Sequence, residues 1–236
     1  MIALAIDTSG DEATVALVRD EPGAAAGEPR RREVLGGEVL ATGMRHGVEL
    51  FPALERIFRG AGVSPRDVDL VAVGTGPGSY TGLRVGITAA RAFAYAASAD
   101  LLGVPSCDAW AAATATDGRP LAVVLDARIR AVYVAVYESE NGTWARRFGP
   151  ELSDPALAAA RIPHDAVVVG DGAGAYAESF PGRSPSPTPA RAEAAQIARL
   201  ALDRLGRGEH DAIESVVPLY LRRPEAEIKR EARTHD

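Results

Sequence analysis

The sequence has one cysteine, no long apolar run and no excess of positive charge. Cys107 is the single cysteine among the 236 residues, so no internal disulfide can form and a disulfide-stabilised secreted fold is excluded. No apolar stretch reaches the roughly 18 residues that a membrane-spanning helix needs. The chain enters an apolar run directly at Met1–Ile6, without the basic region of a signal peptide, which predicts a cytoplasmic protein with no membrane segment.

Net charge argues against a protein that binds nucleic acid on its own. Acidic residues (32) outnumber Lys and Arg (26), which gives a formal net charge of −6. A nucleic-acid-binding face is basic because it neutralises phosphates. Hydrophobic residues make up 47% and charged residues 25% of the chain, which is typical of a folded protein rather than a disordered one. The length suffices for one large domain or two small ones.

Two sequence patterns occur twice, in the same order. An apolar run that ends in an aspartate, Ile2–Asp7, is followed by five turn-like residues and the apolar run Ala13–Val18. The same arrangement recurs at Leu121–Asp126 and Val132–Tyr137 without a gap. Each unit predicts a buried strand, a tight turn headed by the aspartate, and a second, antiparallel strand.

The second pattern is glycine-rich. Val71–Tyr80 and Val167–Tyr176 share three apolar residues followed by Gly-x-Gly-x-Gly-x-Tyr. Together the two repeats predict a duplicated α/β fold in which each lobe is a mixed sheet flanked by helices. This is the architecture of RNase H-like lobes in the actin, Hsp70 and sugar-kinase superfamily.

The predicted lobes divide the chain near its middle. We expect the first lobe at residues 1–104 and the second at 105–220, with a long helix at 190–206 completing the second lobe. Residues 20–33 are rich in Gly, Ala and Arg, which predicts a flexible hairpin loop. Residues 221–236 alternate in charge and are predicted to form a flexible tail.

The turns that follow the predicted strands are candidates for phosphate chemistry. Asp and hydroxyl side chains at a strand end can meet a phosphate or Mg²⁺, and a glycine-rich turn that opens a helix can bind an anion through its N–H groups. The alternative is structural, because the same residues close Asx-type turns and tight turns that require positive φ. No Walker lysine accompanies the glycines. The candidate residues of this nucleotide cleft, which would be vestigial in a non-catalytic chain, are Asp7, Thr8, Ser9, Gly76, Asp126, Gly170 and Gly172.

Metal and thiol chemistry have little support in the sequence. The four histidines lie far apart, and none forms an i, i+3 or i, i+4 pair. Cys107 has no cysteine partner and no histidine nearby in the sequence, so we expect a small buried residue rather than a nucleophile.

One stretch of the sequence is specific enough to suggest a family. Gly76–Gly86, with the sequence GPGSYTGLRVG, resembles the signature of the bacterial TsaB (YeaZ) family. Four further segments resemble it as well: Ala5–Ser9, Val124–Arg128, Gly170–Ala173 and Pro218–Arg222. Together these segments extend from one end of the chain to the other.

The resemblance implies a function in tRNA modification. Members of the family are non-catalytic scaffold and dimerisation subunits of the complex that transfers threonylcarbamoyl to N6 of adenosine 37, in tRNAs reading codons that begin with A. The implied partners are TsaD, the paralogous transferase that forms a heterodimer with TsaB, and the ATPase TsaE, and tRNA is met only through the complex. No cofactor is implied. The sequence leaves open a weak nucleotide site in the cleft or at an interface, and a homodimer of the isolated chain.

A comparison with TsaD separates a subunit from an enzyme. In TsaD a Gly-Val step is followed by Asn-His-x-x-x-His, whose histidines bind the catalytic metal. Here Gly103-Val104 is followed by Pro-Ser-Cys-Asp-Ala-Trp, so Ser106 and Trp110 stand at the ligand positions. An indole cannot bind a metal and a serine is a poor substitute for imidazole, which argues against a TsaD-like metalloenzyme. The remaining alternative is an ATP-dependent phosphotransferase or ATPase of the same superfamily.

Two predicted helices are candidates for a partner interface. Along residues 80–98, small residues fall at every fourth position and predict a smooth ridge that another helix could approach closely. Along 47–61, the apolar residues spread over more than the ~100° stripe that one core requires. The alternative is that both helices pack only on their own sheet. The predicted interface residues are Val48, Phe51, Leu54, Phe58, Gly82, Gly86, Ala90 and Ala94.

Overall fold

The computed structural model describes residues 1–25, 28–40, 46–115, 117–182 and 194–222. Nearly all of the predicted charged tail therefore lies outside the described residues. Within the described part of the chain, no helix combines the length and the apolar character that crossing a membrane requires.

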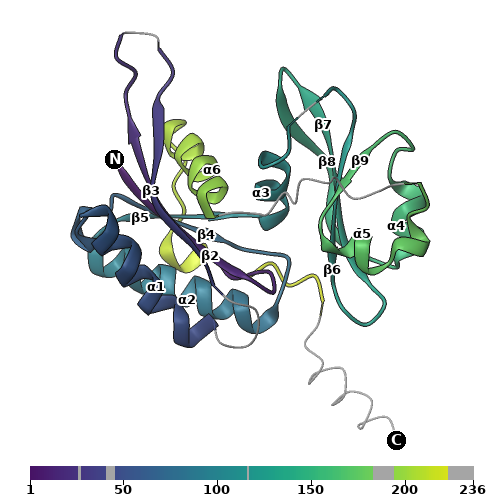
Figure 1. The fold of residues 1–236 in the computed structure, drawn as a ribbon, viewed down its shortest axis with the longest axis horizontal. Coiled ribbons are helices and arrows are strands. Elements are labelled where there is room, and N and C mark those ends of the chain that lie inside the picture. The colour runs from purple at the N-terminus through teal and green to yellow at the C-terminus, as the bar shows by residue number, and fades with distance from the viewer. Residues whose placement is uncertain (26–27, 41–45, 116, 183–193, 223–236) are drawn as a thin grey trace, which may run out of the picture.

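Five strands form the sheet of the first lobe, and the chain order of the strands differs from their order in space (Figure 1). The first three strands are antiparallel neighbours, whereas β4 and β5 run parallel to β1. The spatial order is β3-β2-β1-β4-β5. The strands are β1 (Ile2–Asp7), β2 (Ala13–Glu21), β3 (Arg31–Leu40), β4 (Leu70–Gly74) and β5 (Asp100–Val104).

The sheet of the second lobe repeats this arrangement with one strand fewer. Its spatial order, β8-β7-β6-β9, matches β3-β2-β1-β4 strand for strand, with the same antiparallel and parallel pairings. The predicted duplication of an RNase H-like lobe is therefore confirmed. The strands are β6 (Leu121–Asp126), β7 (Val132–Glu140), β8 (Thr143–Ser153) and β9 (Val167–Val169). The helices that accompany them are α3 (Ser106–Ala112), α4 (Pro155–Arg161) and α5 (Asp171–Ala175).

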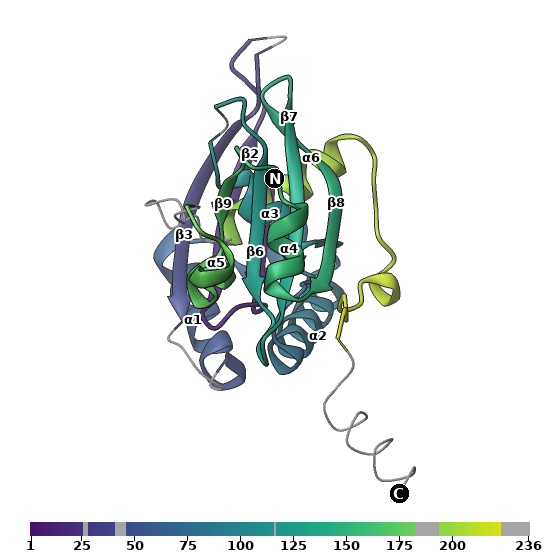
Figure 2. The same ribbon diagram turned by 90° about the vertical axis from the view of Figure 1, so that its right-hand side faces the viewer.

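Helices α1 (His46–Ala61) and α2 (Tyr80–Ala97) cover one face of the first sheet (Figure 1), and both lie at the lower end of the molecule in Figure 2. The large apolar residues of the strands point toward these helices, because side chains alternate between the two faces of a strand. Leu4 and Ile6 of β1 are fully buried there beside Leu50 of α1. Burial of this layer stabilises the first lobe because it removes apolar side chains from water.

The opposite face of the first sheet is covered by α6 (Ala194–Gly206), which comes after the second lobe in the sequence (Figure 1). Several strand residues on this face are small: Ala3, Ala5 and Ala72 are buried in the same core cluster as the helix. Small residues let the helix lie close to the sheet. The prediction that this helix completes the second lobe is wrong, since the chain crosses back to the first.

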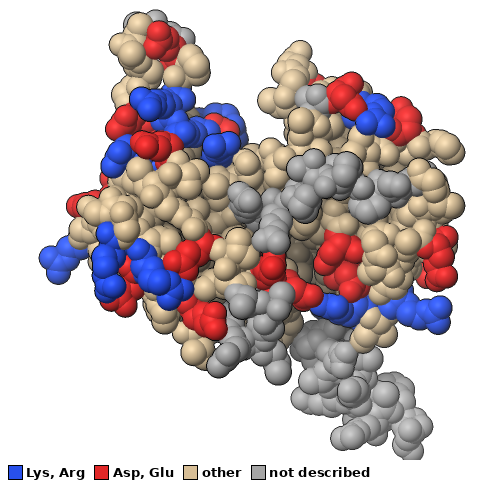
Figure 3. Space-filling view, in the orientation of Figure 1, with Lys and Arg blue, Asp and Glu red and all other residues tan. Residues whose placement is uncertain are grey.

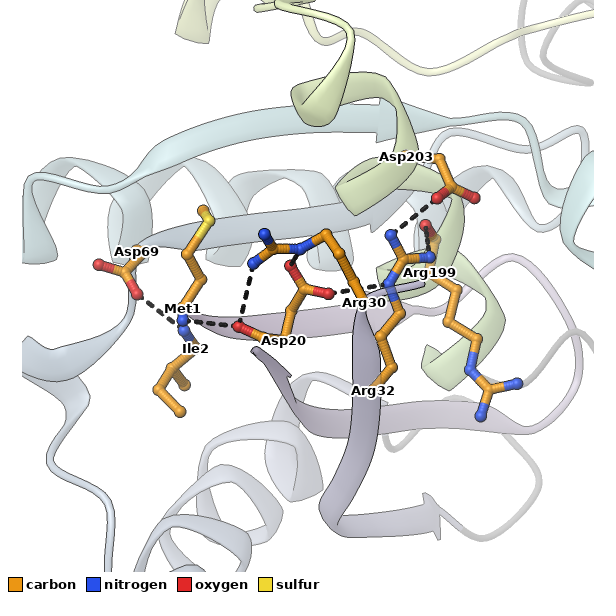
Figure 4. A network of polar contacts seen from close by, with 8 residues as sticks. All are labelled: Met1, Ile2, Asp20, Arg30, Arg32, Asp69, Arg199 and Asp203. Atoms are coloured by element: carbon orange, nitrogen blue, oxygen red, sulfur yellow. Dashed lines mark hydrogen bonds and ion pairs between the residues drawn. The ribbon is translucent and has the colours of Figure 1, made fainter. Parts of the chain in front are cut away.

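The β2–β3 hairpin is better ordered than the sequence suggests. Strand β2 continues to Glu21 and β3 begins at Arg31, so the two ends of the predicted flexible loop over 20–33 are paired strand. Asp20 is 3% exposed, and its carboxylate accepts hydrogen bonds from Arg30 Nε (2.6 Å) and Arg32 Nε (3.1 Å) (Figure 4). A second ion pair, from Arg32 to Asp203 of α6, ties the hairpin to that helix.

Arginines gather at this end of the molecule, but acidic side chains lie among them. Figure 3 shows blue and red residues side by side over the hairpin rather than an unbroken basic surface. Arg19, for example, lies near both Glu21 and Glu33. This end of the face in view therefore carries charges of both signs.

Candidate functional site

A cleft of about 360 Å³ lies between the two lobes, where the turns that follow β1, β4 and β6 meet. Of the seven predicted cleft residues, Ser9 and Asp126 line it directly. Several other lining residues were not among the predicted cleft residues, although Asp11 follows Asp7 closely enough in the sequence to have been a candidate. The charged and aromatic residues that line the cleft are Asp11, Tyr80, Trp110, Asp126, Arg128, Tyr133, Asp171, Tyr220 and Arg222.

Asp7 lies beneath the cleft rather than in it. Its side chain is 4% exposed, and Oδ1 accepts a hydrogen bond from the backbone N–H of Ser9 at 2.9 Å. Burial raises the pKa of the carboxyl group to about 6, although hydrogen bonds from Ser9 and Ser106 oppose the shift. A β-carbon on Gly74 would approach Oδ1 to 2.4 Å, so the neighbouring strand leaves room only for glycine. Asp7 therefore has a structural role: its buried carboxylate binds the backbone of the turn that follows β1.

The glycine-rich turn after β4 uses its N–H groups within the protein. Gly76 N–H donates to Ser106 Oγ at 3.2 Å, and Ser79 N–H donates to the carbonyl of Ser9 at 2.7 Å. A β-carbon on Gly78 would lie 2.2 Å from the same carbonyl. The glycines thus let the turn pack against the β1–β2 turn. These two donors are already satisfied by protein acceptors, which favours the structural interpretation over a phosphate site.

The equivalent turn of the second lobe is structural in the same way. Gly170 has a φ of +103°, and a β-carbon there would lie 2.2 Å from the carbonyl oxygen of Val124. The Asp171 carboxylate accepts the backbone N–H of Asp126 at 2.9 Å. A β-carbon on Gly172 would lie 2.7 Å from the carbonyl carbon of Leu125, near the end of β6. The two duplicated turns therefore join strand ends within each lobe.

The residues at the metal-ligand positions of TsaD have other contacts here. Ser106 is fully buried, and its hydroxyl accepts the Gly76 hydrogen bond, while Trp110 lines the cleft. Cys107 is buried, as predicted, and burial raises the pKa of its thiol, which keeps it protonated. Among the residues that the structure describes, no cluster of three His, Cys, Asp or Glu side chains could hold a metal ion.

The predicted small-residue ridge on α2 faces inward. Gly82, Gly86, Ala90 and Ala94 are all buried. A β-carbon would lie 2.1 Å from the Thr8 carbonyl at Gly82 and 2.2 Å from Thr8 Oγ1 at Gly86. Thr8 Oγ1 also donates to the Gly82 carbonyl at 2.7 Å. Assigning the ridge to a partner interface was therefore wrong: it lets α2 approach the β1–β2 turn of its own lobe.

The predicted interface residues on α1 fall into two groups. Leu54 and Phe58 are 4% and 5% exposed and belong to the core, so their assignment to an interface was also wrong. Val48 and Phe51, in contrast, are 71% and 58% exposed. On α2 the exposed side carries Tyr95, at 81%, which the sequence analysis did not select. The exposed apolar side chains of these two helices, Val48, Phe51 and Tyr95, are together called the α1–α2 face below.

Two RNase H-like lobes with one strand order, facing each other across a cleft, define an α/β protein of the actin, Hsp70 and sugar-kinase superfamily. Among solved structures, the chain is similar to YeaZ from Pseudomonas aeruginosa, with a TM-score of 0.73 and 27% identity over 93% of this chain and 100% of that one. The family model TsaD: tRNA N6-adenosine threonylcarbamoyltransferase matches residues 41–230.

Curated relatives agree with the structural similarity. The tRNA threonylcarbamoyladenosine biosynthesis protein TsaB of Escherichia coli is 30% identical over 94% of this chain and 95% of its own. An uncharacterised protein of Mycobacterium tuberculosis is 34% identical over 87% of this chain and 89% of its own. The chain belongs to the TsaB (YeaZ) family.

Proposed function

We propose that this chain is a non-catalytic scaffold subunit in the biosynthesis of threonylcarbamoyladenosine at position 37 of tRNA, the process named in its E. coli relative. In this proposal it pairs with a TsaD-family transferase, joins a TsaE-type ATPase, and meets tRNA only through the complex. The observation that carries the absence of chemistry is the internal hydrogen bonding of the turn at Gly76–Ser79, whose donors bind Ser106 and Ser9 instead of a phosphate.

The α1–α2 face supplies the surface for pairing. Val48 and Phe51 lie one helical turn apart at the start of α1, and both are mostly exposed to water. Burying two such side chains against a partner would contribute about 1.5–3 kcal/mol each. Large apolar side chains at the centre of an interface commonly dominate its affinity. The face thus suits a partner that presents apolar helices of its own.

The experiment is copurification with the TsaD-family partner. The double variant Val48→Asp, Phe51→Asp places charge on the face without touching the core, so we expect unchanged thermal melting and loss of the partner. Leu157→Asp is the matched control, since Leu157 is 65% exposed but lies on α4 of the second lobe. Normal pairing by the double variant would overturn the assignment of this face.

The cleft supports a second candidate, a phosphotransferase or ATPase. Asp11 and Asp126 line it from opposite lobes, where a cation bound to nucleotide phosphates could lie. This candidate predicts that the isolated chain hydrolyses ATP at a rate that Asp126→Asn abolishes. The scaffold proposal predicts no turnover above background in either protein, so one assay separates the two.

A further inference from the structure

The last described segment, Val216–Arg222, runs from the first lobe to the second and is called the strap here. In Figure 1 it is the yellow stretch that passes beneath the gap between the lobes. On the first-lobe side Val216 is buried in the core, and Leu219 N–H donates to the Thr75 carbonyl at 2.8 Å. The chain therefore anchors itself to the β4 turn before it crosses.

Tyr220 adds a second anchor on the first lobe. Its ring stacks on Tyr80, with the ring centroids 4.7 Å apart, and its hydroxyl accepts a hydrogen bond from Arg84 Nε at 3.0 Å. The Arg84 guanidinium also lies 4.5 Å from the centre of the Tyr80 ring. Stacking and cation–π contacts of this kind restrict the orientation of the Tyr220 and Tyr80 rings and stabilise the attachment of the strap to the first lobe.

The end of the strap binds the second lobe. Leu221 packs on the core formed by β6 and β7, and Arg222 Nη1 donates to the carbonyls of Ala127 (2.8 Å) and Arg128 (3.1 Å). These carbonyls belong to the β6–β7 turn at the rim of the cleft. One seven-residue segment thus has fixed contacts on both sides of the cleft.

The β6–β7 turn that receives the strap has an unusual backbone. Arg128, Ile129 and Arg130 have φ values of 61°, 51° and 55°, a left-handed conformation that residues with a β-carbon rarely adopt. The conformation is supported by Arg222 and by Asp126, whose carboxylate accepts Arg128 N–H at 2.8 Å. Because the backbone of the turn is held in this way, the Arg128 side chain points in one direction.

The Arg128 side chain connects the β6–β7 turn to the first lobe. Arg128 Nη2 lies 2.5 and 2.6 Å from the two carboxylate oxygens of Asp11, in the β1–β2 turn. The contacts therefore form a ring: first lobe, strap, β6–β7 turn, and first lobe again. Rotation of one lobe against the other would have to break the ion pair, the strap contacts, or both.

We propose that the strap and the Asp11–Arg128 ion pair form an inter-lobe lock, which holds the cleft at one width whether or not a nucleotide is offered. A single exposed ion pair contributes little by itself. The lock is effective because two attachments, the strap and the ion pair, both join the β6–β7 turn to the first lobe, so each limits the motion that the other would leave. The two lobes then keep one relative position instead of rotating about a hinge, a property that goes beyond the proposed scaffold function.

Distance measurements between spin labels on the two lobes test the lock. Arg66→Cys places a label in the turn before β4, and Leu157→Cys places one on α4; both sites are exposed. The native Cys107 is buried and protonated, so it does not compete for the label. With labelled chain diluted into unlabelled chain, only distances within one molecule are recorded. We expect one narrow distribution that Mg²⁺–ATP does not shift.

Removal of the lock should widen that distribution. The double variant Asp11→Asn, Arg222→Ala is expected to give a broader or two-peaked distribution, and each single variant an intermediate width. The single variants keep the test decisive if the double variant melts below the working temperature. Arg147→Ala is the control, because it loses ion pairs to Glu138 and Glu140 that stay within the second lobe. Equal widths in locked and unlocked proteins, or a shift with Mg²⁺–ATP in the locked one, would overturn the proposal.

Discussion

At the scale of single residues, the two helical glycines Gly86 and Gly60 show how differently one residue type is used. A β-carbon at Gly86 would lie 2.2 Å from Thr8 Oγ1, whereas one at Gly60 would meet nothing within 4 Å. We expect Gly86→Ala to lower the free energy of unfolding by about 1–3 kcal/mol through overpacking. Gly60→Ala should raise it by about 0.5–1 kcal/mol, because glycine is unfavourable inside a helix.

Chemical denaturation of the two variants measures both effects. Because both variants replace glycine with alanine, any difference between their free energies of unfolding comes from the surroundings of the two positions. If Gly86→Ala proved as stable as the unaltered chain, the close approach of α2 to the β1–β2 turn would be wrong.

Asp7 makes a prediction about pH. Its pKa is about 6 in the folded chain against 3.8 in the reference state, so the folded protein holds the proton more tightly than the unfolded one. The contribution of Asp7 to the free energy of unfolding therefore falls as pH rises from about 4 to about 6, and is constant above that. Asp7→Asn keeps the shape of the side chain and has no charge to bury.

The expected result is a pH-dependent difference between Asp7→Asn and the unaltered chain. Relative to the unaltered chain, the variant should gain stability between pH 4 and pH 7, by an amount on the order of a few kcal/mol. Unfolding in denaturant at several pH values measures this gain. A difference that is the same at pH 4 and pH 7 would show that burial does not shift this carboxyl group.

At the scale of elements, some residues of α1 stabilise the core, whereas others are exposed and available to bind a partner. Phe58 is 5% exposed and stacks on Phe93, with ring centroids 5.6 Å apart, whereas Phe51 is 58% exposed. We expect Phe58→Ala to cost about 3–5 kcal/mol of stability. Phe51→Ala should cost less than about 1 kcal/mol but weaken copurification with the TsaD-family partner. Thermal melting and pull-down of both variants check the division, and an equal loss of stability would contradict it.

The elements also show what the sequence can and cannot predict. The width of the apolar stripe on α1 correctly indicated an unused outer face, because Val48 and Phe51 add to a core side that Leu54 and Phe58 already fill. The four-residue spacing on α2 correctly indicated close approach. Spacing alone does not name the neighbour, however, and the neighbour is Thr8 of the same chain.

At the scale of the whole molecule, the duplication was readable because both copies keep the same order of apolar strands and glycine turns. Strands produce local sequence patterns, so the two mixed sheets could be predicted from the sequence, whereas their strand orders are seen only in the structure. The placement of α6 did not follow, because the helix packs on strand residues that are far from it in the sequence, such as Ala3, Ala5 and Ala72. The lock was equally hidden, because it joins residues more than 90 positions apart, such as Arg128 with Asp11 and Arg222 with Ala127.

The return of α6 to the first sheet has a consequence for the order of events during synthesis. Ala3, Ala5 and Ala72 are made early, but the helix that shields them begins only at Ala194. A lobe that depends on such distant contacts cannot complete its packing while the ribosome is still adding the middle of the chain. The second lobe, whose strands and helices α3 to α5 are nearly contiguous, is free to fold first. We therefore expect the amino-terminal lobe to complete its packing only after the strands of the second lobe have been made, in contrast to the usual order in which an amino-terminal domain folds first.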